Sequence, residues 1–99
     1  MLLIHPNDTI LVSKQSVWCD LDGDIAILHL ASGVYFGLEG AGGEIWNFLQ
    51  EPRSVGEIVN HLMEKFDVQR HECEQMTFAF LEDLATKELV VVQAHAGVL

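Results

Sequence analysis

Two tight turns constrain the first half of this chain more than any other feature. Asp22-Gly23 and Ala31-Ser32-Gly33 separate short segments that are rich in β-branched and other apolar residues. Connections this short join only neighbouring antiparallel strands, and Gly23 accepts the positive φ that a tight hairpin needs. The sequence therefore predicts a three-stranded meander of residues 17–19, 25–30 and 34–38, with Thr9–Val12 as a further strand candidate.

The second half changes to the three- and four-residue spacing of helices. After a first helix, Ser54-Val55-Gly56-Glu57 matches the capping box that opens a second one. A longer third helix is expected from about Arg70 to Lys87, and Leu89–Val92 is either a last short strand or a packed tail. The predicted fold class is α+β, with a three-stranded antiparallel sheet followed by three helices (βββααα). We expect a single domain over residues 1–99, with its core at about residues 9–92.

The charge of the chain argues against two classes of partner. Five Lys and Arg residues stand against 15 Asp and Glu residues, a net charge of −10. Such a surface repels phosphate backbones and anionic lipid headgroups, so we expect neither nucleic acid nor a membrane as partner. A winged-helix regulator that binds DNA is the main rival class, and it needs a basic recognition helix. The segment Arg70–Glu88 instead holds two cations against five carboxylates.

Targeting signals are not apparent in the sequence. The apolar stretches are far shorter than a membrane span, and Met1–Ile4 lacks the basic flank of a secretory signal. Cys19 and Cys73 lie far apart and form no CxxC motif. Reduced thiols in a cytoplasmic protein are the simplest interpretation.

No residue pattern favours catalysis or a bound metal ion. His71-Glu72-Cys73 is the pair most suggestive of a metal, but helical positions two apart point about 200° apart and cannot share one ion. Asp20, Asp22 and Asp24 resemble the start of a calcium loop, yet the later Glu is missing and a hairpin turn explains them better. Gly40-Ala41-Gly42-Gly43 lacks the Lys of a phosphate-binding loop. We therefore expect no enzyme activity, no cofactor and no metal site.

Apolar residues exceed what a domain of this size easily buries. Residues 34–38 carry apolar or aromatic groups on both faces of a strand, and the third helix adds Met76, Phe78 and Phe80 to its core stripe. Each residue alone is most simply a core residue. Together they suggest a groove between the third strand of the meander and the third helix. That strand is an edge, so its free N–H and C=O groups could pair with a guest strand.

An ordered set of motifs resembles the PqqD family. The motifs are Gly33-Val34-Tyr35-Phe36-Gly37-Leu38, Ile45-Trp46, Ser54-Val55 with Ile58, Phe66-Asp67-Val68, and Phe80-Leu81 with Leu84. The family supplies recognition elements for ribosomally made and modified peptides (RiPPs), and this chain looks most like the stand-alone leader-binding proteins of lasso-peptide pathways. The resemblance implies a winged-helix-like fold and a precursor leader peptide that adds to the third strand. It also implies a separate leader peptidase of the same pathway as a partner.

The cleft that the resemblance implies gives the candidate site. Its peptide-binding residues would be Val34, Tyr35, Phe36, Gly37, Leu38, Glu39, Cys73, Met76, Thr77 and Phe80. Glu39 departs from the family, which often has Asn there, and Met76 replaces a residue that is often acidic. The alternative function is an acidic winged-helix adaptor, or a structural subunit of a larger complex, that uses the same groove.

Overall fold

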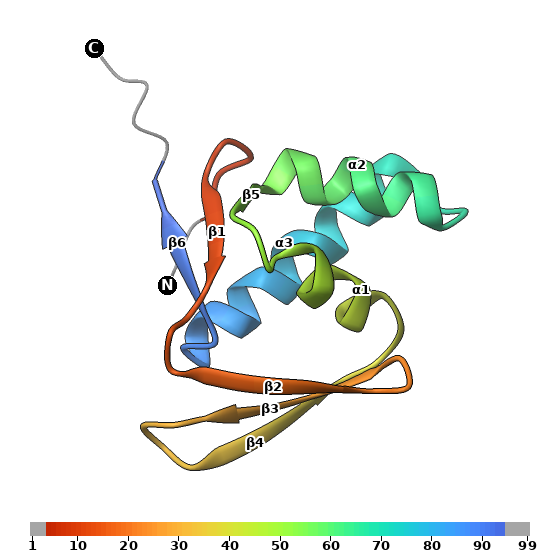
Figure 1. Ribbon diagram of the computed structural model, residues 1–99. Helices are drawn as coiled ribbons and strands as arrows, with labels where there is room; N and C mark the ends of the chain where they lie inside the picture. The colour runs from red at the N-terminus through yellow and green to blue at the C-terminus, as the bar shows by residue number, and fades with distance from the viewer. Residues whose placement is uncertain (1–3, 95–99) are drawn as a thin grey trace.

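A computed structural model describes residues 4–94 of the chain, in which antiparallel strands and three helices form an α+β fold (Figure 1). The elements are β1 (Thr9–Val12), β2 (Ser16–Leu21), β3 (Asp24–His29), β4 (Val34–Leu38), α1 (Gly40–Phe48), β5 (Arg53–Ser54), α2 (Val55–Lys65), α3 (Arg70–Thr86) and β6 (Val90–Gln93). The strands form two three-stranded sheets, so the predicted order βββααα is incomplete. The α+β class is confirmed, and the winged-helix likeness stays a prediction.

The predicted meander is confirmed as the sheet β2-β3-β4. Its first turn has two residues, since Leu21 pairs with Asp24 across it. Asp22 and Gly23 adopt φ values of 65° and 102°, the left-handed conformation that such hairpins require. The Gly23 N–H also donates to Asp20 Oδ1 at 2.7 Å, so the first acid of this segment stabilises the turn. The hairpin interpretation of these acids is therefore confirmed.

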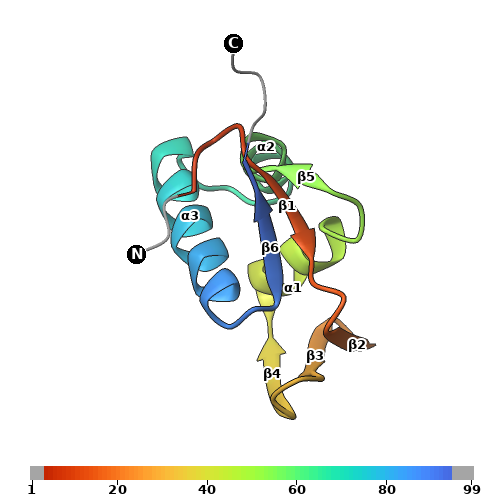
Figure 2. The same ribbon diagram turned by 90° about the vertical axis from the view of Figure 1, so that its left-hand side faces the viewer.

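The second sheet joins the two ends of the described chain. β1 lies at its centre, between β5 and β6, and Figure 2 shows β1 and β6 side by side. The register pairs Thr9 with Gln93 and Val12 with Val90. The apolar segment near residue 90 is thus a strand rather than a packed tail, and it pairs with β1 in a sheet separate from the meander.

Local signals place the helices as the sequence predicts. The capping box of α2 is formed, because Ser54 N–H donates to Glu57 Oε1 at 2.8 Å and Glu57 N–H donates to Ser54 Oγ at 3.1 Å. The start of α3 at Arg70 agrees with the sequence, and its end at Thr86 lies one residue before the expected end. In contrast, α1 begins after Glu39, whose side chain makes no capping hydrogen bond.

The core lies between the helices, the inner face of the meander and the second sheet, which contributes the buried Ile10 and Val90. Ile25 and Ile27 of β3 are almost fully buried against Trp46 of α1, Ile58 of α2 and Leu81 of α3. This packing fixes the end of β4, the start of α1 and the middle of α3 relative to one another. Within residues 4–94, no helix is long and apolar enough to cross a membrane.

Candidate functional site

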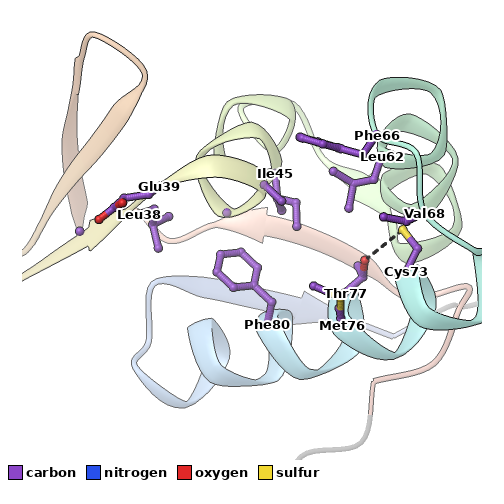
Figure 3. A pocket seen from close by; sticks show the side chains of 13 residues that line it. Leu38, Glu39, Ile45, Leu62, Phe66, Val68, Cys73, Met76, Thr77 and Phe80 are labelled. Atoms are coloured by element: carbon purple, nitrogen blue, oxygen red, sulfur yellow. Dashed lines mark hydrogen bonds between the residues drawn. The ribbon is translucent and has the colours of Figure 1, made fainter.

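An apolar groove of about 470 Å³ opens where the end of β4 meets α1, α2 and α3 (Figure 3). Glu39 is the single charged residue among those that line it in the described part of the chain. The lining residues are Gly37, Leu38, Glu39, Ala41, Gly42, Ile45, Leu62, Phe66, Val68, Cys73, Met76, Thr77 and Phe80. Such a surface suits apolar side chains rather than a charged ligand.

One face of α3 supplies four of these side chains, because residues three and four apart lie on the same side of a helix. Cys73 and Thr77 are buried and form the floor, with Cys73 Sγ 4.0 Å from Thr77 Oγ1. Met76 is 66% exposed and forms a rim, while Phe80 is half-buried. Figure 3 shows the Phe80 ring below Leu38, so the helix and the strand end meet across the groove.

Two glycines of α1 explain the small-residue stretch that follows β4. A Cβ on Gly42 would lie 3.1 Å from the Phe80 ring, which is closer than ordinary contact. A Cβ on Gly43 would lie 3.1 Å from the Gly23 carbonyl oxygen in the hairpin turn. The missing side chains let α1 pack tightly against both α3 and the meander, and this packing gives the groove one of its walls.

The other end of the groove comes from α2 and the segment after it. Leu62 is buried there, whereas Phe66 and Val68 are 39% and 37% exposed. Six lining residues are not among the candidates predicted from the sequence: Ala41, Gly42, Ile45, Leu62, Phe66 and Val68. Phe66 and Val68 could have been found from the sequence. They are two apolar residues that flank the break between two helices, where core packing does not require apolar side chains.

The groove brings together seven of the ten candidate residues, from Gly37 to Glu39 and on α3. The other three, Val34, Tyr35 and Phe36, do not line it. Val34 and Tyr35 are 47% and 73% exposed. Phe36 is half-buried, and Lys87 Nζ lies 5.4 Å from the centre of its ring. These three side chains therefore lie outside the groove, although their strand leads into it.

The register of the meander determines which main-chain groups of β4 face outward. Leu21 and Asp24 flank a two-residue turn and so form a hydrogen-bonded pair, and bonded pairs then alternate along β2 and β3. The Leu30 N–H donates to the Gln15 carbonyl at 2.8 Å, which agrees with this alternation. Every second residue of β3, beginning with Ile25, consequently turns its N–H and C=O toward β4.

The same alternation applies to β4, whose other side is an open edge. Val34, Phe36 and Leu38 are opposite His29, Ile27 and Ile25, so their main-chain groups face β3. The N–H and C=O of Tyr35 and Gly37 face the open edge instead. The edge thus presents two pairs of main-chain groups beside an apolar groove.

One histidine and one acid beside the groove, His61 and Glu44, pair with each other. His61 Nε2 lies 2.7 Å from Glu44 Oε2, and the His61 ring stacks on Phe48 at 4.1 Å. These contacts join α2 to α1 behind the groove. Among residues 4–94, no three His, Cys, Asp or Glu side chains are grouped closely enough to hold a metal ion.

Comparison with known proteins gives one family and two similar structures. The pattern of the family described as coenzyme PQQ synthesis protein D (PqqD) matches residues 24–90. The structure of TbiB1 in complex with the TbiA(beta) leader peptide is 34% identical in sequence, with a TM-score of 0.78 over 90% of this chain and 98% of that chain. A lasso peptide synthetase B1 complexed with the leader peptide is 18% identical, with a TM-score of 0.74 over 83% and 96% of the two chains; it supports the fold alone. No curated protein matches the sequence.

Proposed function

This chain belongs to the PqqD family, and we propose that it binds the leader segment of a ribosomally made precursor peptide in lasso-peptide maturation. The observation that carries the proposal is the open edge of β4 beside an apolar groove. An edge strand can pair with an extended peptide, and a neighbouring groove can select its side chains. The structure of TbiB1 in complex with a leader peptide supports this proposal, because TbiB1 is 34% identical to this chain over most of its length.

The leader would add to β4 as a further strand. Its main chain would pair with Tyr35 and Gly37, whose N–H and C=O groups face the open edge. Because side chains alternate along a strand, every second leader residue would point to the groove side. Met76 and Phe80 on the far wall would then contact apolar leader side chains. The leader-binding residues in this proposal are those named from the sequence, with Tyr35 acting through its main chain.

The chain would hold the leader without cleaving it, and a separate leader peptidase would act on the bound precursor. Cys73 is the one thiol in the lining, its Sγ lies 4.0 Å from the Thr77 hydroxyl, and no histidine lines the groove in the described part of the chain. A cysteine nucleophile needs a base and an environment that stabilises the thiolate. The apolar lining supplies neither, which supports a binding role.

A titration with fluorescently labelled leader peptide tests the proposal. The probes are the leader of the precursor from the same pathway and the TbiA(beta) leader peptide. We expect the first to bind with a dissociation constant in the micromolar range or below, about −8 kcal/mol. Met76→Ser should weaken binding, whereas Val91→Ser, on the other sheet, should not. Absence of binding by both peptides at about 100 µM, roughly −5.5 kcal/mol, would refute leader recognition.

A further inference from the structure

The meander has a second face that carries apolar side chains and that no helix covers. Cross-strand neighbours align Val17, Leu28 and Tyr35 in one row and Cys19, Ala26 and Gly37 in the next. We call these six residues the outer face. Neither row contains a charged residue, although 20% of the chain is charged. An antiparallel sheet with one solvated face normally carries polar side chains there.

Four of the six outer-face residues are exposed, and Ala26 and Leu28 are half-buried. Val17 and Tyr35 are 52% and 73% exposed, and Cys19 is also exposed. Figure 1 shows α1 and α3 on one side of the meander. The buried Ile25 and Ile27 of β3 belong to the same core cluster as Trp46 of α1 and Leu81 of α3. The outer face points the other way, so the groove and the outer face share β4 but lie on different surfaces.

The charged residues beside the outer face indicate which class of molecule could bind to it. The turn at one end of the meander holds Asp20, Asp22 and Asp24, all exposed. Their carboxylates favour a partner with Lys or Arg beside its apolar patch. They disfavour anionic lipid and nucleic acid for the same reason.

A second copy of the chain has few Lys or Arg side chains that could pair with the carboxylates of the acidic turn. Of five Lys and Arg residues, four pair with carboxylates of their own chain. The pairs are Arg53–Glu51, Lys65–Glu44, Arg70–Glu74 and Lys87–Asp83. Two copies would each also carry a net charge of −10, so self-association through this face would be opposed by repulsion.

The size of the face agrees with a partner that extends over the acidic turn. Three strands about 4.8 Å apart and two rows about 6.8 Å apart give an area of about 200 Å². A stable interface buries about 800 Å² on each partner. The partner must therefore contact more than the outer face, and the exposed Leu21 continues the apolar surface onto the turn.

We propose that the outer face is a docking surface for a separate protein whose contact patch is apolar and bordered by Lys or Arg side chains. The acidic turn would meet the basic border, and Val17, Leu28 and Tyr35 would form the apolar centre. A partner docked there would lie beside the groove without blocking it. Binding of a peptide and binding of a protein could thus occur together on β4.

A matched pair of variants tests this surface. Val17 and Val91 are both 52% exposed and both lie on edge strands, but Val91 belongs to the other sheet. The probe is the purified leader peptidase of the same pathway, a choice that rests on the proposed function. We expect Val17→Lys to weaken peptidase binding at least about tenfold and Val91→Lys to change it by less than about twofold. Both variants should keep leader-peptide binding and a wild-type melting temperature.

Two further measurements guard against a folding artefact. Asp22→Asn keeps a residue that tolerates the positive φ of the turn, and should slow association with the peptidase by reducing electrostatic steering. Alkylation of Cys19 with N-ethylmaleimide should slow when the peptidase is added. Cys73 is buried and provides an internal reference thiol.

The outcomes separate this proposal from leader recognition. Peptidase binding that is equal in wild type and Val17→Lys overturns the docking surface, as does undiminished alkylation of Cys19. A concentration-dependent dimer that Val17→Lys abolishes would assign the face to a second copy and would also overturn the proposal. Leader peptides that fail to bind while Val17→Lys still lowers peptidase binding would refute leader recognition alone.

Discussion

Replacing Tyr35 with proline should abolish most leader binding while leaving the domain folded. Proline removes the Tyr35 N–H, which faces the open edge of β4 and makes no bond to β3. Proline is tolerated on edge strands when the lost N–H points away from the sheet. Phe36→Pro is the matched comparison, because the Phe36 N–H faces β3 and its loss breaks the meander.

The size of the effect follows from one main-chain hydrogen bond. Losing the bond costs about 1 kcal/mol, and leaving the leader carbonyl without a donor costs about 1–3 kcal/mol more. A total of about 2–4 kcal/mol corresponds to a dissociation constant about 30- to 900-fold higher. Tyr35→Phe, which changes the side chain only, should bind the leader within about threefold of wild type, a difference below 1 kcal/mol.

Fluorescence anisotropy with the labelled leader and a thermal melt of each variant provide the two readouts. Tyr35→Pro should melt near the wild-type temperature, whereas Phe36→Pro should melt far below it. Wild-type affinity in a folded Tyr35→Pro variant would show that the leader does not pair with this edge. A leader bound as a helix in the groove would then be the better explanation.

Three further substitutions probe the groove and its support. Phe80→Ala should weaken leader binding by about 2 kcal/mol, in the range of a hot spot, and a melt will separate this loss from any change in folding. Gly42→Ala places a Cβ 3.1 Å from the Phe80 ring, so it should displace the ring and weaken binding about fivefold, or 1 kcal/mol, while the melting temperature stays near wild type. Ser54→Ala removes the capping box and should cost about 1 kcal/mol of folding stability, whereas Glu57→Gln, which keeps a side-chain acceptor, should cost little by the same thermal melt. An unchanged melting temperature for Ser54→Ala would contradict the capping argument.

Features of the fold that depend on near neighbours could be predicted from the sequence. The Asp22-Gly23 hairpin and the Ser54 capping box each involve residues within four positions of one another, so their signals are local. The pairing of β1 with β6 joins Thr9 to Gln93, and no short motif specifies such a partner. β5 is only two residues long and shows no alternation that would identify it as a strand.

The part of the candidate groove that could be predicted is the part that depends on the spacing of residues along one helix. The four α3 residues share a helix face, so their meeting in the groove follows from helical geometry. Leu62 is not among the predicted site residues, because helical spacing indicates that a side chain is buried but not that it also forms part of a groove. The sequence does not show which residues of β4 turn their N–H groups toward the open edge. The register of β3 with β4 shows that Tyr35 does so and that Phe36 does not.

The pairing of Thr9 with Gln93 also makes this domain suitable for transplantation. Opposed residues on paired antiparallel strands lie about 5 Å apart, so the start of β1 and the end of β6 lie close together. A host protein could carry residues 4–94 in place of a surface turn. Residues 4–8 must stay with the fold, because Ile4 packs in the core and the Pro6 and Asp8 carbonyls accept hydrogen bonds from the start of α2. The groove would then be available as a peptide-binding site within the host protein. In a circular permutant, the two ends of the domain would be joined and new termini would be placed elsewhere in the chain.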